Sequence, residues 1–433
     1  MIKLLFKNQF FNSTLIYTIS TVINSAIPFL LIPILTRHLS SPDYGIISIY
    51  TVLVAFVTPF IGYTIHGSIT AMIFSSEKDN VPEYIGNCFY ILFASTILTS
   101  FIFLIISNWI EFQFKLPIFW VWSSIFLAFN QFITLFPLTI WQANNKPLYF
   151  GIFQIGSTVI NFSITLLLVI YFNKNWEGRI EAQLITSLLF SIISFFILLK
   201  NKLIVFKFNS KYFFSAIKFG VPLILHVIGG IFLSIINRFF IAKYVGLGEA
   251  GLFFLAFQLT GIINIFTSAL NTAYVPWLFS KLENNNLVEK RKIVSLTYYY
   301  FLFLVLSSFI FATVLPNMLH LLVGKDYFMA QKYFNWLIVG CISNGMYLMV
   351  TNYIVYAKKT VFLAWSTFFS SLLTVALNLY LIKKYGAIGA AIANALGFTI
   401  LFVSTWILSI KVYQMPWFNS FNKDNECIKS NSI

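Results

Sequence analysis

The sequence predicts an all-α membrane protein, with twelve transmembrane helices in two six-helix lobes around a central cavity. Of the 433 residues, 59% are hydrophobic and only 9% are charged, whereas an ordinary soluble domain carries about 25% charged residues. Apolar stretches of roughly 20 residues, the length that crosses a bilayer, recur along nearly the whole chain. Because so few charges cannot cover a water-soluble surface, we expect the chain to be embedded in a membrane.

Charged or Pro-, Gly- and Asn-rich breaks separate the apolar stretches from one another. The second and eighth stretches are long enough to tilt or kink. The first contains prolines and lacks a small-residue cleavage pattern, so we expect it to be a retained helix and not a signal peptide. The expected spans are Asn12–Leu35, Tyr44–Phe74, Gly86–Ser107, Pro117–Trp141, Leu148–Phe172, Ile180–Leu199, Phe219–Asn237, Ala250–Phe279, Ile293–Leu315, Tyr333–Ala357, Thr360–Ile382 and Ala387–Ile410.

The positions of lysine and arginine predict the orientation. If the N-terminus is cytoplasmic, 18 of the 28 fall on the cytoplasmic side and 10 on the outer side, as the positive-inside rule requires. We therefore expect a multi-pass protein of the bacterial inner membrane with both termini in the cytoplasm. The net charge of +15 is scattered over short loops and forms no basic stripe, so nucleic acid is not an expected partner.

A degenerate internal repeat predicts the two lobes. The same pattern occurs in Arg37–Gly45 and in Lys243–Gly251. Each begins with a cation, which is followed by an aliphatic residue two positions later, an acidic residue six positions later and a glycine eight positions later. A second echo pairs Gly178–Ala182 with Gly386–Ala390, at the matching point of each half.

We therefore expect an N-terminal lobe at residues 1–205 and a C-terminal lobe at 206–433, the latter with a short cytoplasmic tail. An even number of spans precedes the second repeat, so the lobes are related by an axis along the membrane normal. This arrangement favours alternating access by rocking of the lobes. The loops are too short for a soluble catalytic domain.

Polar side chains at helical spacing mark the spans expected to line the cavity. They occur on the first, second, seventh and eighth spans, which are equivalent across the repeat, because intramembrane polar groups should face the protein interior or water. The alternative is that they serve only as hydrogen bonds between helices. The candidates for substrate contact are Asn24, Gln258, Asn264 and Asn271, and the candidates for proton coupling are His66 and His226.

The charged groups of the expected cavity are cations. Lys218, Arg238, Arg37 and Lys243 lie at or near the ends of cavity helices, whereas no Asp or Glu lies deep in any expected span. This imbalance favours an anionic cargo such as a phosphate-bearing lipid. The alternative for these cations is that they reach to the membrane surface.

No catalytic or metal site is legible in the sequence. Cys88, Cys341 and Cys427 lie far apart, and the four histidines share no metal-ligand spacing. A Gly-rich phosphate loop and a catalytic triad are likewise missing from the sequence. We therefore expect neither metal nor cofactor, and a transporter instead of an enzyme.

Three stretches resemble a known family. They are Asn24–Gly45, Phe219–Pro222 with Asn237-Arg238, and the glycine- and alanine-rich Tyr385–Ala391. Together they are similar to Wzx-type polysaccharide flippases of the multidrug/oligosaccharidyl-lipid/polysaccharide exporter superfamily. Asn237 stands where many relatives carry an aspartate.

The resemblance implies a specific cargo, which is an undecaprenyl-diphosphate-linked oligosaccharide repeat unit. It would move from the cytoplasmic to the outer leaflet during O-antigen or capsule assembly, with the polymerase and chain-length regulator of the same pathway as candidate partners. A cation-coupled multidrug or toxin antiporter of the same superfamily stays open as an alternative, although it usually needs a buried carboxylate. An O-antigen polymerase fits less well, because it would need a large outer loop.

The orientation can be tested with reporter fusions. Fusions after Ser210 and after Leu287 should report the cytoplasm, and a fusion after Lys325 should report the outer side, because the lysine-rich loops stay inside. Alkaline phosphatase and fluorescent-protein activities provide the two readouts. An outer-side signal at Ser210 would overturn the predicted topology.

Overall fold

The protein is built from helices. The structure, a computed structural model, describes residues 2–75, 77–283 and 286–417, and within these ranges no strand occurs. The all-α prediction is therefore confirmed for the described part of the chain. The predicted C-terminal tail and Cys427 lie outside the described residues.

Both halves of the sequence are built from helices. The first half contains α1 (Ile2–His38), α2 (Ser41–Val57), η1 (Thr58–Phe60), η2 (Gly62–Thr64), α3 (His66–Ile73), η3 (Lys78–Asn80), α4 (Val81–Phe114), α5 (Ile118–Ala143), α6 (Pro147–Leu166), η4 (Leu167–Tyr171) and α7 (Asn175–Lys200). The second half contains α8 (Ser210–Ser234), α9 (Ile236–Tyr244), α10 (Leu247–Thr260), α11 (Ile262–Glu283), α12 (Leu287–Leu322), η5 (Lys325–Tyr333), α13 (Phe334–Tyr356), α14 (Thr360–Tyr385) and α15 (Ala387–Val412).

These elements agree with the twelve expected spans. Among the described residues, eleven segments are long and apolar enough to cross a membrane, and Val22–His38 within α1 is a shorter apolar segment. The expected kinks are present, since the second span is broken at η1 and η2 and the eighth at Gly261 between α10 and α11. The seventh span is also broken, at Ile235 between α8 and α9.

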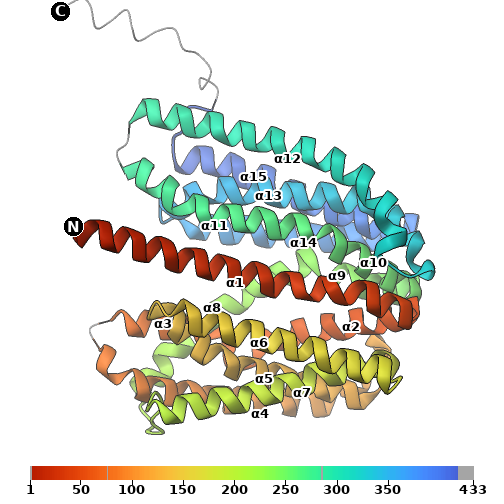
Figure 1. Cartoon of the computed structure of the whole chain (residues 1–433), viewed down its shortest axis with the longest axis horizontal. Helices are drawn as coiled ribbons and strands as arrows, with labels where there is room; N and C mark the ends of the chain where they lie inside the picture. The colour runs from red at the N-terminus through yellow and green to blue at the C-terminus, as the bar shows by residue number, and fades with distance from the viewer. Residues whose placement is uncertain (1, 76, 284–285, 418–433) are drawn as a thin grey trace, which may run out of the picture.

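The helices gather in two groups with α1 between them (Figure 1). Helices α2 to α7 lie on one side of α1, and α10 to α15 lie on the other. We call the end at which α1 finishes and α2 and α10 begin the joined end, and the opposite end, at which α1 begins, the far end. Both groups converge on α1 at the joined end.

Matching contacts occur in the two halves. In the first half α5 packs on α7 and α1 packs on α6, and in the second half α13 packs on α15 and α8 packs on α14. Helix α8 also packs on α3, α4 and η2 of the first half. At the far end Lys211 forms an ion pair with Glu77 at 2.5 Å, and hydrogen bonds from Lys211 and Tyr212 lower the pKa of Glu77. Because α8 touches both halves, the division at 205/206 stays a prediction.

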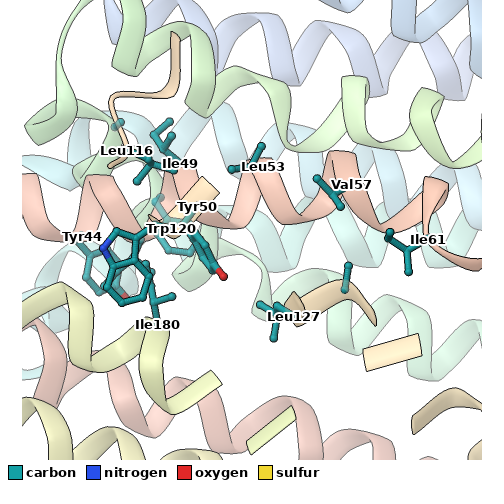
Figure 2. Packing of buried hydrophobic residues seen from close by; sticks show 14 of the residues in the cluster. Tyr44, Ile49, Tyr50, Leu53, Val57, Ile61, Leu116, Trp120, Leu127 and Ile180 are labelled. Atoms are coloured by element: carbon teal, nitrogen blue, oxygen red, sulfur yellow. The ribbon is translucent and has the colours of Figure 1, made fainter. Parts of the chain in front are cut away.

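Helices α2 and α5 contain the best-buried spans of the first half. Figure 2 shows Tyr44, Tyr50 and Trp120 gathered near the start of α2, with Leu53 and Val57 following along the helix. The Tyr50 hydroxyl shares a hydrogen bond with the Ser123 hydroxyl of α5 at 3.0 Å. A membrane interior offers no water to this hydroxyl, so the buried polar atom needs such a partner.

Two glycines allow α2 and α10 to cross in backbone contact at the joined end. A Cβ atom on Gly45 would lie 2.0 Å from the carbonyl oxygen of Leu247, and one on Gly251 would lie 2.0 Å from that of Ser41. Both pairs are repeat equivalents, because 251 − 45 and 247 − 41 equal 206, the offset of the sequence repeat. The same contact is therefore made twice about a pseudo-two-fold axis, and this explains why each copy of the repeat ends in glycine.

The other repeat positions have local roles in helix termini. Arg37 and Lys243 lie in the last turns of α1 and α9, where a cation is favoured by the helix dipole. Asp43 caps α2 together with Ser40, whose hydroxyl donates to its carboxylate at 2.6 Å. Its equivalent Glu249, in the first turn of α10, forms an ion pair with Lys332 of η5 at 2.8 Å.

Adding a methyl group at either crossing glycine should destabilise the protein. We expect Gly45→Ala and Gly251→Ala to lose at least about 1–3 kcal/mol, the usual cost of overpacking, since the atom in the way is a backbone carbonyl that cannot rotate aside. The measurement is thermal unfolding of the purified protein in detergent. Gly230→Ala is the matched control, because a Cβ there meets nothing within 4 Å. An unchanged melting temperature for Gly45→Ala would contradict the crossing.

Candidate functional site

The predicted central cavity is present and lies between the two helix groups near the joined end. Its volume is about 520 Å³. The four equivalent spans expected to line it all contribute, together with α7, which was not expected. The lining residues are Pro28, Phe29, Leu31, Ile32, Leu35, Tyr44, Ile47, Thr51, Arg179, Gln183, Ser234, Ile235, Arg238, Phe254, Phe257, Gln258 and Gly261.

Arg238 is a buried cation that forms no ion pair with any described residue. Only 4% of the residue is exposed, and its Nε has no hydrogen-bond partner among the described residues. The guanidinium carbon lies 4.5 Å from the ring centre of Phe254 and 4.7 Å from that of Phe257. The break at Ile235 places Arg238 in the first turn of α9. The rings attract the cation but leave its N–H donors free for a ligand.

Arg179 is the second cation of the central cavity. It lies one turn inside α7, and its Nη1 donates to the Asn161 side-chain oxygen at 2.6 Å and to the Thr165 hydroxyl at 2.9 Å. These two neutral acceptors on α6 hold the side chain without cancelling its charge. Arg179 was not among the predicted site residues because the sixth span was expected to begin at Ile180, whereas α7 begins at Asn175. The spacing Arg179-x-x-x-Gln183, one helical turn, was the available signal.

Gln258 joins the halves across the central cavity. The hydroxyl of Tyr44, in the first turn of α2, donates to the Gln258 side-chain oxygen on α10 at 2.7 Å. The Tyr44 ring also packs edge-on against Tyr327 of η5, with ring centres 5.7 Å apart. The predicted substrate residue Gln258 thus lines the cavity beside Arg238.

The central cavity is electropositive. Two guanidinium groups line it, and no Asp or Glu does so. Removing an ion from water without a counter-ion costs several kcal/mol, and a cation–π contact returns only about 0.5–2 kcal/mol. An anion bound between the arginines would offset the part of the desolvation cost that the cation–π contacts leave uncompensated.

A second cavity of about 520 Å³, which we call the far cavity, lies closer to the far end between α1, α5, α6 and α11. The predicted residue Asn264 lines it together with Gln142 and Thr272. Asn264 also bonds within the second half, since it accepts from Asn344 at 3.1 Å and donates to the sulfur of Cys341 at 3.3 Å. The two cavities thus follow α1 in succession.

A third cavity, which we call the side cavity, lies inside the first helix group and measures about 280 Å³. It shares Pro28 and Gln183 with the central cavity. Eight of its twelve lining residues are polar but uncharged, and these are Gln131, Thr134, Ser157, Thr158, Asn161, Gln183, Thr186 and Ser187.

Two predicted asparagines form hydrogen bonds between helices. Asn24 of α1 accepts from the Thr158 hydroxyl of α6. Asn271 of α11 accepts from the Asn352 amide of α13 at 2.8 Å. Neither lines the three cavities described above, so their positions agree with the alternative of hydrogen bonding between helices.

The other predicted cations lie outside the three cavities. Arg37 is exposed and donates to the Leu321 carbonyl oxygen at the end of α12, at 3.1 Å. Its repeat equivalent Lys243 donates to the Gln113 side chain at the end of α4, at 2.7 Å. Both contacts cross between halves at the joined end. Lys218 is exposed on α8.

The two histidines are separated in the structure. His66 begins α3 and packs edge-on against Phe132, with ring centres 6.1 Å apart. Its Nδ1 is buried and has no hydrogen-bond partner among the described residues. His226 is exposed on α8. Neither lines the central, far or side cavity.

Comparisons with known proteins agree with this architecture. The chain is 26% identical over 370 residues to the Lsg locus protein 1 of Haemophilus influenzae, covering 84% of this chain and 90% of that protein. The fold is similar to a multidrug resistance MATE family transporter of the MOP superfamily in an inward-facing conformation, with TM-score 0.66, 13% identity and 96% of both chains covered. It is also similar to the lipid II flippase MurJ, with TM-score 0.62, 17% identity, and 96% of this chain and 90% of MurJ covered.

The fold is thus one found in membrane transporters and flippases. The family described as polysaccharide biosynthesis protein matches residues 10–283, which is more than half of the chain. The chain is a multi-pass membrane protein that belongs to this polysaccharide biosynthesis protein family.

Proposed function

We propose that the protein is a flippase that moves an undecaprenyl-diphosphate-linked oligosaccharide repeat unit from the cytoplasmic to the outer leaflet, for O-antigen or capsule assembly. The observation that carries the proposal is Arg238, which lines the central cavity, is almost wholly buried and has no acidic partner there. The family match to polysaccharide biosynthesis proteins supports the same substrate class.

The chemistry of Arg238 and Arg179 suits a diphosphate. A guanidinium presents N–H donors in a rigid planar fork that matches phosphate oxygens, and charge-assisted hydrogen bonds are about twice as strong as neutral ones. A diphosphate entering the membrane plane loses its hydration, which is prohibitive without compensating charge. Two arginines in one cavity supply that compensation, and the lipid tail remains in the bilayer.

The arrangement of the ends supports alternating access with two rocking lobes. The joined end is held by the glycine crossing of α2 and α10 and by the Tyr327 hydroxyl, which donates to the carbonyl oxygen of Ser40 at 2.8 Å. In the proposed inner-membrane orientation with cytoplasmic termini, the joined end faces outward. Lys218 then meets the headgroup during loading, and Arg37 and Lys243 meet it during release, where a polymerase and a chain-length regulator receive the product.

The antiporter alternative lacks support at the cavities. Transport of an organic cation usually relies on a carboxylate in the binding site, and the central, far and side cavities are lined by none. Energy coupling by protons is assigned in this proposal to His66 and His226.

The proposal predicts that Arg238 is required for lipid transport. In proteoliposomes carrying a fluorescent polyprenyl-diphosphate disaccharide, Arg238→Gln should lower the translocation rate at least about tenfold, since losing one charge-assisted contact is worth more than about 1.4 kcal/mol. Arg238→Lys should retain partial activity, because a point charge keeps the attraction but loses the fork. Dithionite quenching of the outer leaflet measures the rate.

The matched control is Lys384→Gln, which removes one exposed positive charge at the end of α14 and should transport like the wild type. Ethidium uptake by the same vesicles tests the antiporter alternative and should be absent. Wild-type lipid translocation by folded Arg238→Gln, or ethidium transport without lipid translocation, would refute the proposed function.

A further inference from the structure

The side cavity is an uncharged polar chamber inside a membrane-spanning helix group. Polar residues in such a position are costly unless they bond one another or a ligand. Several of the hydroxyls are already satisfied, since Ser157 and Ser187 donate to backbone carbonyls of their own helices. The side-chain amides of Gln131, which is exposed, and of Gln183, which is half-buried, in contrast form no hydrogen bond with any described residue. The chamber therefore offers two complete amide groups that lack partners.

We propose that the side cavity binds the first sugar of the lipid-linked saccharide while the diphosphate lies between Arg179 and Arg238. This inference rests on the proposed function and specifies it further, by dividing the substrate between two adjoining chambers. Each amide provides two donors and an acceptor, and this combination complements sugar hydroxyl and acetamido groups, which also donate and accept.

The central cavity and the side cavity adjoin each other, as the binding of a diphosphate and its attached sugar would require. Gln183 lines both of them, and Asn161, which lines the side cavity, accepts the hydrogen bond from Arg179 of the central cavity. A headgroup held by Arg179 thus lies next to the side cavity. A sugar is bonded directly to the diphosphate, so the neighbouring chamber is where its first ring would fall.

The chamber is larger than a single water needs and lacks the charge that a phosphate needs. The volume of 280 Å³ lies close to the lower limit of about 300 Å³ for small-molecule pockets, and it far exceeds the roughly 30 Å³ of one water. No cation lines the side cavity, so a phosphate would be left without charge compensation. Phe153 and Phe190 pack edge-on in its wall, with ring centres 5.0 Å apart, and they present apolar surface to the C–H face of a sugar ring.

The test compares two synthetic probes, polyprenyl diphosphate with and without a single N-acetylhexosamine, by native mass spectrometry titration of the full-length protein. The wild type should bind the glycosylated probe about tenfold more tightly, as two extra hydrogen bonds predict. Gln131→Leu should remove most of this preference and leave the affinity for the bare diphosphate unchanged. Gln183→Leu, at a residue that lines both chambers, should also remove most of the preference, whatever its effect on the bare diphosphate. Gln142→Leu, a matched amide in the far cavity, should keep the preference.

Different experimental outcomes would refute the sugar site and the proposed function. If the wild type binds both probes equally, or if Gln131→Leu weakens both probes in the same proportion, the sugar site is refuted while the flippase proposal stands. If sodium chloride alone raises the melting temperature and Gln131→Leu abolishes that effect, the chamber is an ion site and the sugar assignment is wrong. If neither probe binds the wild type, the proposed function itself fails.

Discussion

The backbone contact between α2 and α10 is the constraint on which the rest of the architecture depends. Gly45 and Gly251 bring the two helices together at the joined end, where they face Leu247 and Ser41. Lipid tails are as apolar as leucine, so helices in a membrane gain little from hydrophobic burial and rely on close packing and hydrogen bonds. With a larger side chain at either glycine, the helices would separate, and the hydrogen bond from Tyr44 to Gln258 would be lost.

The same contact sets the electrostatics of the central cavity. Phe254 and Phe257, which flank the guanidinium of Arg238, lie on α10, and Arg238 follows the break between α8 and α9. The arginine is therefore held by aromatic rings that attract it only moderately. A carboxylate in their place would hold the cation more strongly, and it would compete with any anionic ligand. The weak native partner keeps Arg238 charged, ordered and available.

Periodicity and composition were sufficient to predict the helices, their approximate ends, the repeat and the cavity between the halves. They predicted Arg238 as a site residue, but not that it would be buried, because burial depends on how the broken seventh span turns. Arg179 was missed because a charged residue near the predicted start of a span was assigned to the loop. Asn24 and Asn271 were chosen for polarity alone, and polarity does not distinguish a residue facing a cavity from one facing a neighbouring helix. That distinction depends on helix rotation, which a single sequence does not determine.

Helix α8 belongs to the second half by sequence, yet it packs on α3, α4 and η2 of the first. Gly220 approaches the carbonyl oxygen of Tyr63 closely enough that a Cβ atom would lie 2.2 Å from it, and Phe219 lies against Gly67. During synthesis, η2 and α3 therefore lack their contacts with α8 until that helix has been inserted. The strained turn at Tyr63 and Thr64, both with positive φ, would be held in that interval by α4 and η1 without α8. Assembly of the two halves is consequently interlocked, and the first half completes its own fold only with a helix that is made after it.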